Sequence, residues 1–248
     1  MAKKAIPLDQ LPLFSKSFAE EFDPEQFKTG TVYLLDKPLE WSSFDVVKFV
    51  RNRIKVKKTG HAGTLDPLAT GLLVLCSGKA TKSISQVQDQ PKEYLAEITF
   101  GKSTPSYDAA LEPDEEAGWQ HITEQMISEV LASEFSGVIA QKPPIYSAIK
   151  MKGERLYKKA RRGEEVEIEP RNVEILETEI LEYIAPILKL RVKCGKGTYI
   201  RSLAHDLGLA LNSRAFMSAL RRTAIGGFHV DNAVTPEQFD QILKENHG

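Results

Sequence analysis

One carboxylate stands in a glycine-rich stretch of the chain, Gly60-His61-Ala62-Gly63-Thr64-Leu65-Asp66-Pro67-Leu68-Ala69-Thr70-Gly71-Leu72-Leu73, which lies between a basic segment and an apolar run. Gly60 and Gly63 permit backbone angles that residues with a β-carbon resist, so the loop can present His61 and hold Asp66 at a fixed place. An Asp-Pro pair is also an ordinary helix start, with Asp as the N-cap and Pro at the first helical position. These residues alone allow both interpretations, a reactive loop and a helix cap.

The periodicity of apolar residues predicts an α+β fold. Strand patterns are predicted over 31–35, 72–76, 94–100, 173–183 and 187–194. Helical spacing is predicted over 43–54, 79–87, 123–135, 200–211 and 235–244. Strands and helices do not alternate strictly, which favours a mixed, mainly antiparallel central sheet flanked by helices over a doubly wound parallel sheet.

The composition indicates a chain that can fold without a structural metal ion or a disulfide bond. A length of 248 residues allows a full apolar core. Cys76 and Cys194 sit among apolar neighbours, so we expect two buried, reduced thiols rather than a disulfide or a metal site. The N-terminus lacks the apolar core of a secretory signal, and no stretch is long enough to span a membrane. We therefore expect a cytoplasmic protein that needs no metal and no cofactor.

Positive charge is concentrated in two segments although the formal net charge is −1. Residues 142–163 hold eight Lys and Arg against one acid, interleaved with Tyr146 and Tyr157. Residues 189–222 hold eight more against Asp206 alone. A charge run is most often a solvated face. Two such runs with aromatics, beside a candidate reactive loop, favour a surface that binds RNA.

Five ordered blocks of this sequence resemble the bacterial tRNA pseudouridine-55 synthases. The first is the glycine-rich stretch around Asp66. The other blocks are Leu35-Asp36-Lys37-Pro38 with Trp41-Ser42-Ser43, Gln141-Lys142-Pro143-Pro144-Ile145-Tyr146-Ser147-Ala148-Ile149-Lys150, Gly195-Lys196-Gly197-Thr198-Tyr199-Ile200-Arg201-Ser202-Leu203-Ala204 and Leu220-Arg221-Arg222-Thr223-Ala224-Ile225-Gly226. Together they cover about residues 30 to 230. The resemblance implies an antiparallel-dominated sheet with the catalytic loop across its middle.

The resemblance implies isomerisation of uridine 55 in the T-loop of tRNA, a cofactor-free reaction on a flipped-out base. Asp66 matches the nucleophile, and Arg201 matches the arginine that pairs with it and keeps it ionised. Tyr94 matches the tyrosine that stacks on the flipped uracil. Four further positions match substrate-binding residues of the family: His61, Tyr199, Leu220 and Lys37.

The expected organisation is an N-terminal extension over 1–29, a catalytic domain over 30–232 and a short helical tail over 233–248. The resemblance is to a short form of the family, without the C-terminal RNA-binding domain that its members commonly carry. The expected partner is the T-arm of tRNA. Neither a membrane nor a protein partner is implied, and we expect a monomer.

Three alternatives compete with this interpretation. The first is an RNA-binding protein or tRNA chaperone that uses the basic segments and has no need of Asp66. The second is a relative that modifies rRNA under guide RNAs, against which the lack of basic tails argues. The third is a metal-dependent hydrolase built on His61, Asp66, His205 and Asp206, which has suitable residue types but no recognised ligand spacing.

Overall fold

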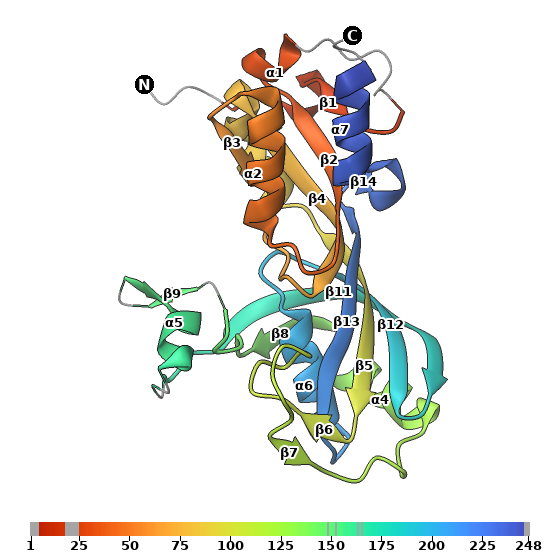
Figure 1. Cartoon of the computed structure of the whole chain (residues 1–248). Helices are drawn as coiled ribbons and strands as arrows, with labels where there is room; N and C mark the ends of the chain where they lie inside the picture. The colour runs from red at the N-terminus through yellow and green to blue at the C-terminus, as the bar shows by residue number, and fades with distance from the viewer. Residues whose placement is uncertain are drawn as a thin grey trace. The chain divides into compact units, whose positions relative to one another are not determined.

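The computed structural model describes residues 5–17, 25–147, 149–151, 153–162, 164 and 166–245, without the side chains of 150, 151, 155, 157, 158 and 161. Two compact units make up the chain (Figure 1). Unit 1 holds residues 1–93 and 221–248, and unit 2 holds residues 94–220. Two strands, β5 (Lys92–Phe100) and β13 (Ala215–Ile225), run through the boundary and contribute residues to both units.

Unit 1 is a sheet covered on both faces. Its strands follow the order β1-β2-β4-β13. In addition, β3 pairs with β4 and β14 pairs with β13. Their bounds are β1 Leu13–Phe14, β2 Val32–Lys37, β3 Thr59–His61, β4 Ala69–Ser77 and β14 Phe228–His229. Strands β1 and β2 pair in parallel, and the pairs β2–β4, β3–β4 and β13–β14 are antiparallel.

Alternate residues of the unit 1 strands belong to two separate apolar clusters. Tyr33 and Leu35 of β2 pack in one cluster with helices α2 (Ser43–Ile54) and α7 (Pro236–Glu245), which lie side by side in Figure 1. Val32 and Leu34 pack in the other cluster. Three short helical elements complete that side: η3 (Gly78–Ser83), α3 (Ile84–Gln88) and η4 (Val230–Asn232). The two-residue period places successive side chains on opposite faces, so both faces of this sheet are buried.

Residues of the predicted N-terminal extension take part in the unit 1 core. Phe14 and Phe27 are both buried. The centroid of the Tyr33 ring lies 6.0 Å from that of Phe14 and 5.9 Å from that of Phe27. Phe27 belongs to α1 (Gln26–Thr29), and η1 (Leu8–Gln10) precedes β1. Residues 1–4 and 18–24 of the extension lie outside the described residues. The described part of the segment is thus anchored by aromatic packing.

Among its described residues, unit 2 consists of a sheet and three helices. Its strands follow the order β13-β5-β12-β11-β8. Their bounds are β8 Gly137–Gln141, β11 Arg171–Ile184 and β12 Ile187–Cys194. Strand β11 runs antiparallel to both β12 and β8. The helices are α4 (Glu124–Glu134), α5 (Leu156–Arg161) and α6 (Ile200–Ala210). Two small antiparallel pairs lie outside the large sheet. They join β6 (Lys102–Ser103) to β7 (Glu115–Glu116) and β9 (Lys150–Met151) to β10 (Glu154–Arg155).

The predicted α+β class with a mainly antiparallel sheet is confirmed. The helix predicted over 43–54 has those bounds, and Cys76 and Cys194 are buried as expected. The helix predicted over 79–87 is divided between η3 and α3. No helix begins at Asp66, because Pro67 and Leu68 form a turn that leads directly into β4. Among the described residues no helix is long and apolar enough to cross a membrane.

Candidate active site

The Asp66 loop connects β3 to β4 and is fixed at three points within unit 1. Ser43 Oγ donates to the carbonyl of Leu65 at 2.9 Å and accepts from the amide of Leu65 at 2.8 Å. The same serine is the first residue of α2, so the residue before Asp66 is tied to a capped helix. Because Ser43 is buried, water does not compete for these two hydrogen bonds. The carboxylate is therefore held on a backbone of defined position.

Arg222 provides the second anchor. Its side chain is 1% exposed, its Nε donates to the carbonyl of Leu72 at 2.7 Å, and its Nη2 donates to the carbonyl of Gly63 at 3.2 Å. The guanidinium thus joins the first half of the loop to the strand that follows it. Gly71 makes room for this arrangement, since a β-carbon there would lie 2.3 Å from the Arg222 carbonyl oxygen. A buried arginine between β13 and the loop places a fixed positive charge in this region.

Lys37 provides the third anchor from the end of β2. Its ammonium donates to the carbonyls of Trp41 at 2.6 Å, Pro38 at 2.9 Å and Pro67 at 3.3 Å. The side chain is fully buried. Burial lowers the pKa of Lys37 to about 8, and the neighbouring Asp66 carboxylate opposes that shift. These contacts hold the Lys37 side chain against the loop, and the substrate-binding role that the family resemblance implies stays a prediction.

Asp66 and His61 occupy the accessible part of the loop. Asp66 is half-buried between the exposed residues Thr64 and Pro67. His61 is half-buried at the end of β3, and its Nδ1 has no hydrogen-bond partner. Burial lowers the pKa of His61 below its ordinary value, while a hydrogen bond with the Gly63 backbone opposes the shift. The lowered pKa favours the neutral form of the His61 ring.

The four other predicted site residues belong to unit 2. Arg201, on α6, is 4% exposed and its Nη1 lies 3.4 Å from Asp108 Oδ2. It also donates to the carbonyls of Ser106 at 3.2 Å and Tyr146 at 3.1 Å. Asp108 in turn accepts from Ser106 Oγ at 2.6 Å. The guanidinium is therefore oriented by a carboxylate and two carbonyls of its own unit.

Tyr199, the N-cap residue of α6, is held by Gln141. The Gln141 side chain donates to the Tyr199 carbonyl at 3.0 Å and accepts from the Tyr199 amide at 2.8 Å. The Arg171 guanidinium lies over the Tyr199 ring, 5.0 Å from its centroid. Tyr94 is half-buried on β5, and Leu220 is 9% exposed on β13. Lys37, His61 and Asp66 are thus described within unit 1, and Tyr94, Tyr199, Arg201 and Leu220 within unit 2.

Sequence analysis assigned no functional role to three anchoring residues, Ser43, Gln141 and Arg222. All three stand in the sequence blocks that carry the family resemblance, which is the signal that could have singled them out. Their chemistry could not have done so, because a serine at a helix start, a glutamine in a strand and an arginine beside a second arginine are common surface residues. Only the fold shows that they are buried.

Most cations of the second basic segment, 189–222, are buried or paired with carboxylates, whereas Lys193 and Lys196 are exposed. Arg201 and Arg222 are buried, and the other paired cations face carboxylates. These ion pairs are Lys189–Glu182, Arg191–Glu177, Arg191–Glu179, Arg214–Glu115 and Arg221–Asp36. The sequence count therefore overstated the charge that this segment offers to RNA, because its acidic partners lie outside the segment.

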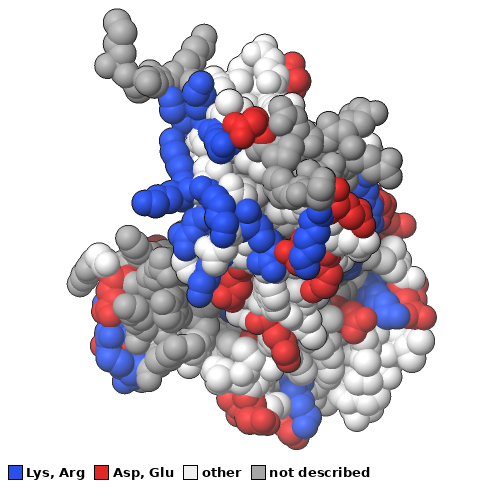
Figure 2. Space-filling view, turned by 45° about the horizontal axis from the view of Figure 1, so that its top comes forward, with Lys and Arg blue, Asp and Glu red and all other residues white. Residues whose placement is uncertain are grey.

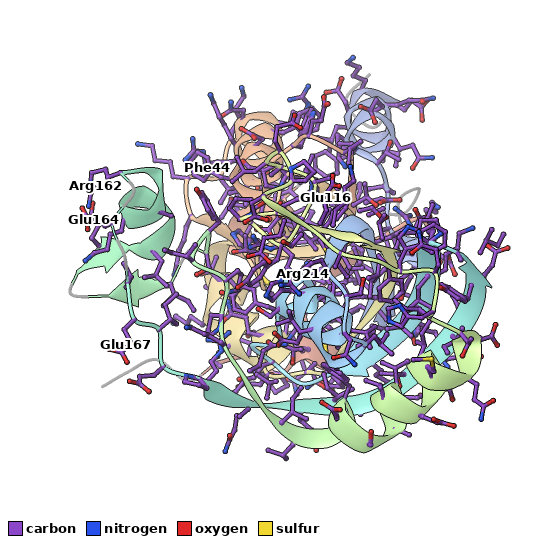
Figure 3. All side chains as sticks on the ribbon, turned by 90° about the horizontal axis from the view of Figure 1, so that it is seen from below. Phe44, Glu116, Arg162, Glu164, Glu167 and Arg214 are labelled. Carbon is purple, nitrogen blue, oxygen red and sulfur yellow. The ribbon has the colours of Figure 1, made fainter. Side chains whose placement is uncertain are left out.

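The first basic segment, 142–163, is described only in part. Arg162 forms ion pairs with Glu164 at 2.7 Å and with Glu154 at 2.8 Å, and Figure 3 shows Arg162 beside Glu164. Lys152 lies outside the described residues, as do the side chains of Lys150, Arg155, Tyr157, Lys158 and Arg161. Within the described ranges no group of three His, Cys, Asp or Glu side chains is placed to hold a metal ion. His205, named in the hydrolase alternative, stacks on Tyr107 at 3.8 Å.

The whole chain is similar to known pseudouridylate synthases. Residues 51–200 match the family described as "TruB family pseudouridylate synthase (N terminal domain)", and residues 201–247 match "tRNA pseudouridylate synthase B C-terminal domain". A protein of Flavobacterium johnsoniae named "tRNA pseudouridine synthase B" is 50% identical over 89% of this chain and 99% of its own length. A protein of the same name from Parabacteroides distasonis is 47% identical over 89% of this chain and 96% of its own length.

Solved structures show the same fold in larger proteins. The chain in "Crystal Structure of a Cbf5-Nop10-Gar1 Complex" superposes with a TM-score of 0.70 at 29% identity, covering 100% of this chain and 64% of that one. The chain in "Structure of H/ACA RNP bound to a substrate RNA containing 2'-deoxyuridine" gives a TM-score of 0.68 at 28% identity, over 93% of this chain and 59% of that one. This chain thus spans about three fifths of the proteins in these two structures.

Proposed function

Because the chain belongs to the TruB family of pseudouridylate synthases, we propose that it isomerises uridine 55 in the T-loop of tRNA to pseudouridine. The observation that carries this proposal is the Asp66 loop. Its carboxylate is half-buried on a backbone that Ser43, Lys37 and Arg222 fix from three directions. A preorganised carboxylate lowers the entropic cost of reaching the transition state.

In the proposed reaction Asp66 attacks either the sugar or the uracil ring of the flipped-out nucleotide. The N1–C1′ bond breaks, the uracil turns, C5 bonds to C1′, and the bond between Asp66 and the nucleotide breaks to release the carboxylate. The proton on C5 leaves and N1 takes one up, so atoms and electrons balance without an oxidant, a reductant or a group donor. The proposal therefore requires no cofactor. The carboxylate must be ionised, and we assign Arg201 as the cation that favours its ionised form.

The remaining site residues receive roles in binding the flipped base. We assign Tyr94 to stacking on the uracil and Tyr199 and Leu220 to the lining of its pocket. His61, whose lowered pKa favours the neutral ring, would fill the space that the base leaves in the RNA. A cytoplasmic monomer acting on the T-arm, without a protein partner, is the simplest form of this proposal.

Positional mapping of pseudouridine tests the proposed substrate. Unmodified tRNA transcript labelled with tritium at C5 of uracil would be incubated with the protein, without metal or nucleotide. Tritium release and a single pseudouridine at position 55 are expected, and a transcript with cytidine at position 55 should release none. Release from other positions, or from the cytidine transcript, would contradict the assignment of uridine 55. Binding of tRNA without any release would favour the chaperone alternative.

A further inference from the structure

One face of helix α2 carries an exposed aromatic ring followed by three cations. Phe44 is 62% exposed, Lys48 and Lys55 are exposed, and Arg51 is half-buried. Their spacing of four, three and four residues places them along one side of the helix and its C-cap, roughly 16 Å in length. The opposite side holds Val46, Val47, Val50 and Ile54, which are buried in the core. We name the set Phe44, Lys48, Arg51 and Lys55 the α2 stripe.

The cations of the α2 stripe have an acidic neighbour on their own helix, Asp45, whose carboxylate interacts with Lys48 and is held by Ser42 in the capping box. Residues 46–59 contain six Lys and Arg and no acid. Arg53 is left out of the stripe because it forms an ion pair. Its Nε lies 2.5 Å from Oδ1 of Asp240 on α7, and its guanidinium lies over the Phe49 ring. Among the described residues Lys48, Arg51 and Lys55 take part in no ion pair, in contrast to the paired cations of segment 189–222. Figure 2 shows Lys and Arg gathered over the part of unit 1 that carries α2.

The α2 stripe begins beside the candidate catalytic loop. Phe44 follows Ser43, whose hydroxyl is bonded to the backbone of Leu65, next to Asp66. At its far end Arg51 and Lys55 line a surface depression of about 250 Å³ together with Asn52 and Lys57. A strand that leaves the Asp66 loop along α2 therefore meets first an aromatic face and then positive charge. Stacking aromatics beside cations are the features by which proteins bind single-stranded nucleic acid.

We propose that the α2 stripe binds an RNA strand of the substrate next to the target nucleotide, with Phe44 stacking on a base and Lys48, Arg51 and Lys55 contacting phosphates. This inference rests on the proposed function, since it places the strand relative to the Asp66 loop. Phe44, labelled at α2 in Figure 3, is 62% exposed and therefore accessible to such a base. Contacts of this kind hold substrate and transition state alike, so they lower KM and leave kcat unchanged.

Kinetics and salt dependence of designed variants test the α2 stripe. The first variant, Lys48→Ala/Arg51→Ala/Lys55→Ala, removes its three cations. The matched control, Lys28→Ala/Lys102→Ala/Lys244→Ala, removes three others whose side chains are 68, 51 and 75% exposed and whose ion pairs at the surface contribute little. The stripe variant should raise KM for unmodified tRNA at least tenfold with kcat unchanged. The slope of log affinity against log salt should fall by about two for three lost phosphate contacts.

Phe44→Ala tests the stacking contact separately. Loss of a stacked base should raise KM about tenfold, and Phe44→Tyr, which keeps the aromatic face, should restore it. Thermal unfolding would confirm that these exposed substitutions leave the fold intact. Wild-type KM and salt slope in the stripe variants, or an equal loss in the control, would overturn the inference while the proposed function stands. If the wild-type protein itself releases no tritium, the proposed function fails first.

Discussion

Arg201 Nη1 lies 3.4 Å from Asp108 Oδ2, and both side chains are almost completely buried. The pair sits in unit 2, where Ser106 contributes a hydroxyl to Asp108 and a carbonyl to Arg201. A buried cation depends strongly on a buried carboxylate partner, because removing one charge leaves the other uncompensated. Asp108 is therefore expected to orient Arg201.

Removal of the Asp108 carboxylate should affect both stability and turnover. For Asp108→Ala we expect the free energy of unfolding to fall by about 3 kcal/mol, as for other buried pairs that lose one partner. Turnover should fall by at least tenfold, because Arg201 loses its orientation. Urea unfolding and single-turnover tritium release measure the two effects. The control is Glu115→Gln, which breaks the more exposed pair with Arg214 and should cost below about 1 kcal/mol.

Ser43 should couple the position of α2 to the activity of Asp66. Ser43→Ala removes both hydrogen bonds to the Leu65 backbone and leaves a buried amide and carbonyl without these partners, at a cost of about 1–3 kcal/mol. Activity should fall more than stability accounts for, since the carboxylate becomes less well positioned.

The neighbouring serine offers a matched control for this prediction. Ser42 caps α2 in a capping box with Asp45, and its loss should cost about 1 kcal/mol of stability. Both variants would be assayed well below their melting temperatures. Equal activity of Ser42→Ala and Ser43→Ala would show that the Leu65 anchor has no part in positioning Asp66.

Stability should rise with pH on account of Lys37. Burial lowers its pKa to about 8 in the folded protein, against 10.5 for the unfolded chain. Between these values the unfolded state binds a proton that the folded state does not, so the free energy of unfolding increases with pH. A gain on the order of 2 kcal/mol is expected from pH 8 to 10.5.

Urea unfolding of wild type and Lys37→Met over this pH range would measure the gain. The methionine side chain does not titrate, so the free energy of unfolding of the variant should depend less on pH than that of wild type. The variant should also be less stable than wild type overall. A wild-type stability that is constant or falls over the same window, with no difference from Lys37→Met, would contradict the assignment of a depressed pKa to Lys37.

Much of the fold follows from local pattern. Helix α2 has its predicted bounds because Ser42 and Asp45 form a capping box and the apolar residues recur at helical spacing. Strand β13 was missed, since Arg221 and Arg222 interrupt its apolar pattern. The strand forms because distant residues accept these cations: Asp36 pairs with Arg221, and the carbonyls of Gly63 and Leu72 bind Arg222.

The candidate site was predictable only as a set of residues. Family resemblance selected Asp66, Tyr94 and Arg201, but the residues that fix them depend on tertiary contacts. The Arg201–Asp108 and Ser43–Leu65 contacts join positions 93 and 22 residues apart, a separation at which periodicity carries no information. The positive charge that segment 189–222 exposes was overestimated from the sequence, because the acids that neutralise its cations lie elsewhere in the chain.

The central claim is that Asp66 is the nucleophile, and single-turnover tritium release by wild type and Asp66→Asn tests it most directly. Asparagine keeps the size of the side chain and removes the charge that attack requires. Binding of tRNA to both proteins would be measured in parallel to confirm an intact fold. The account predicts release by wild type, no detectable release by Asp66→Asn and affinities within a few-fold of each other. Release by Asp66→Asn at a rate near that of wild type would contradict it.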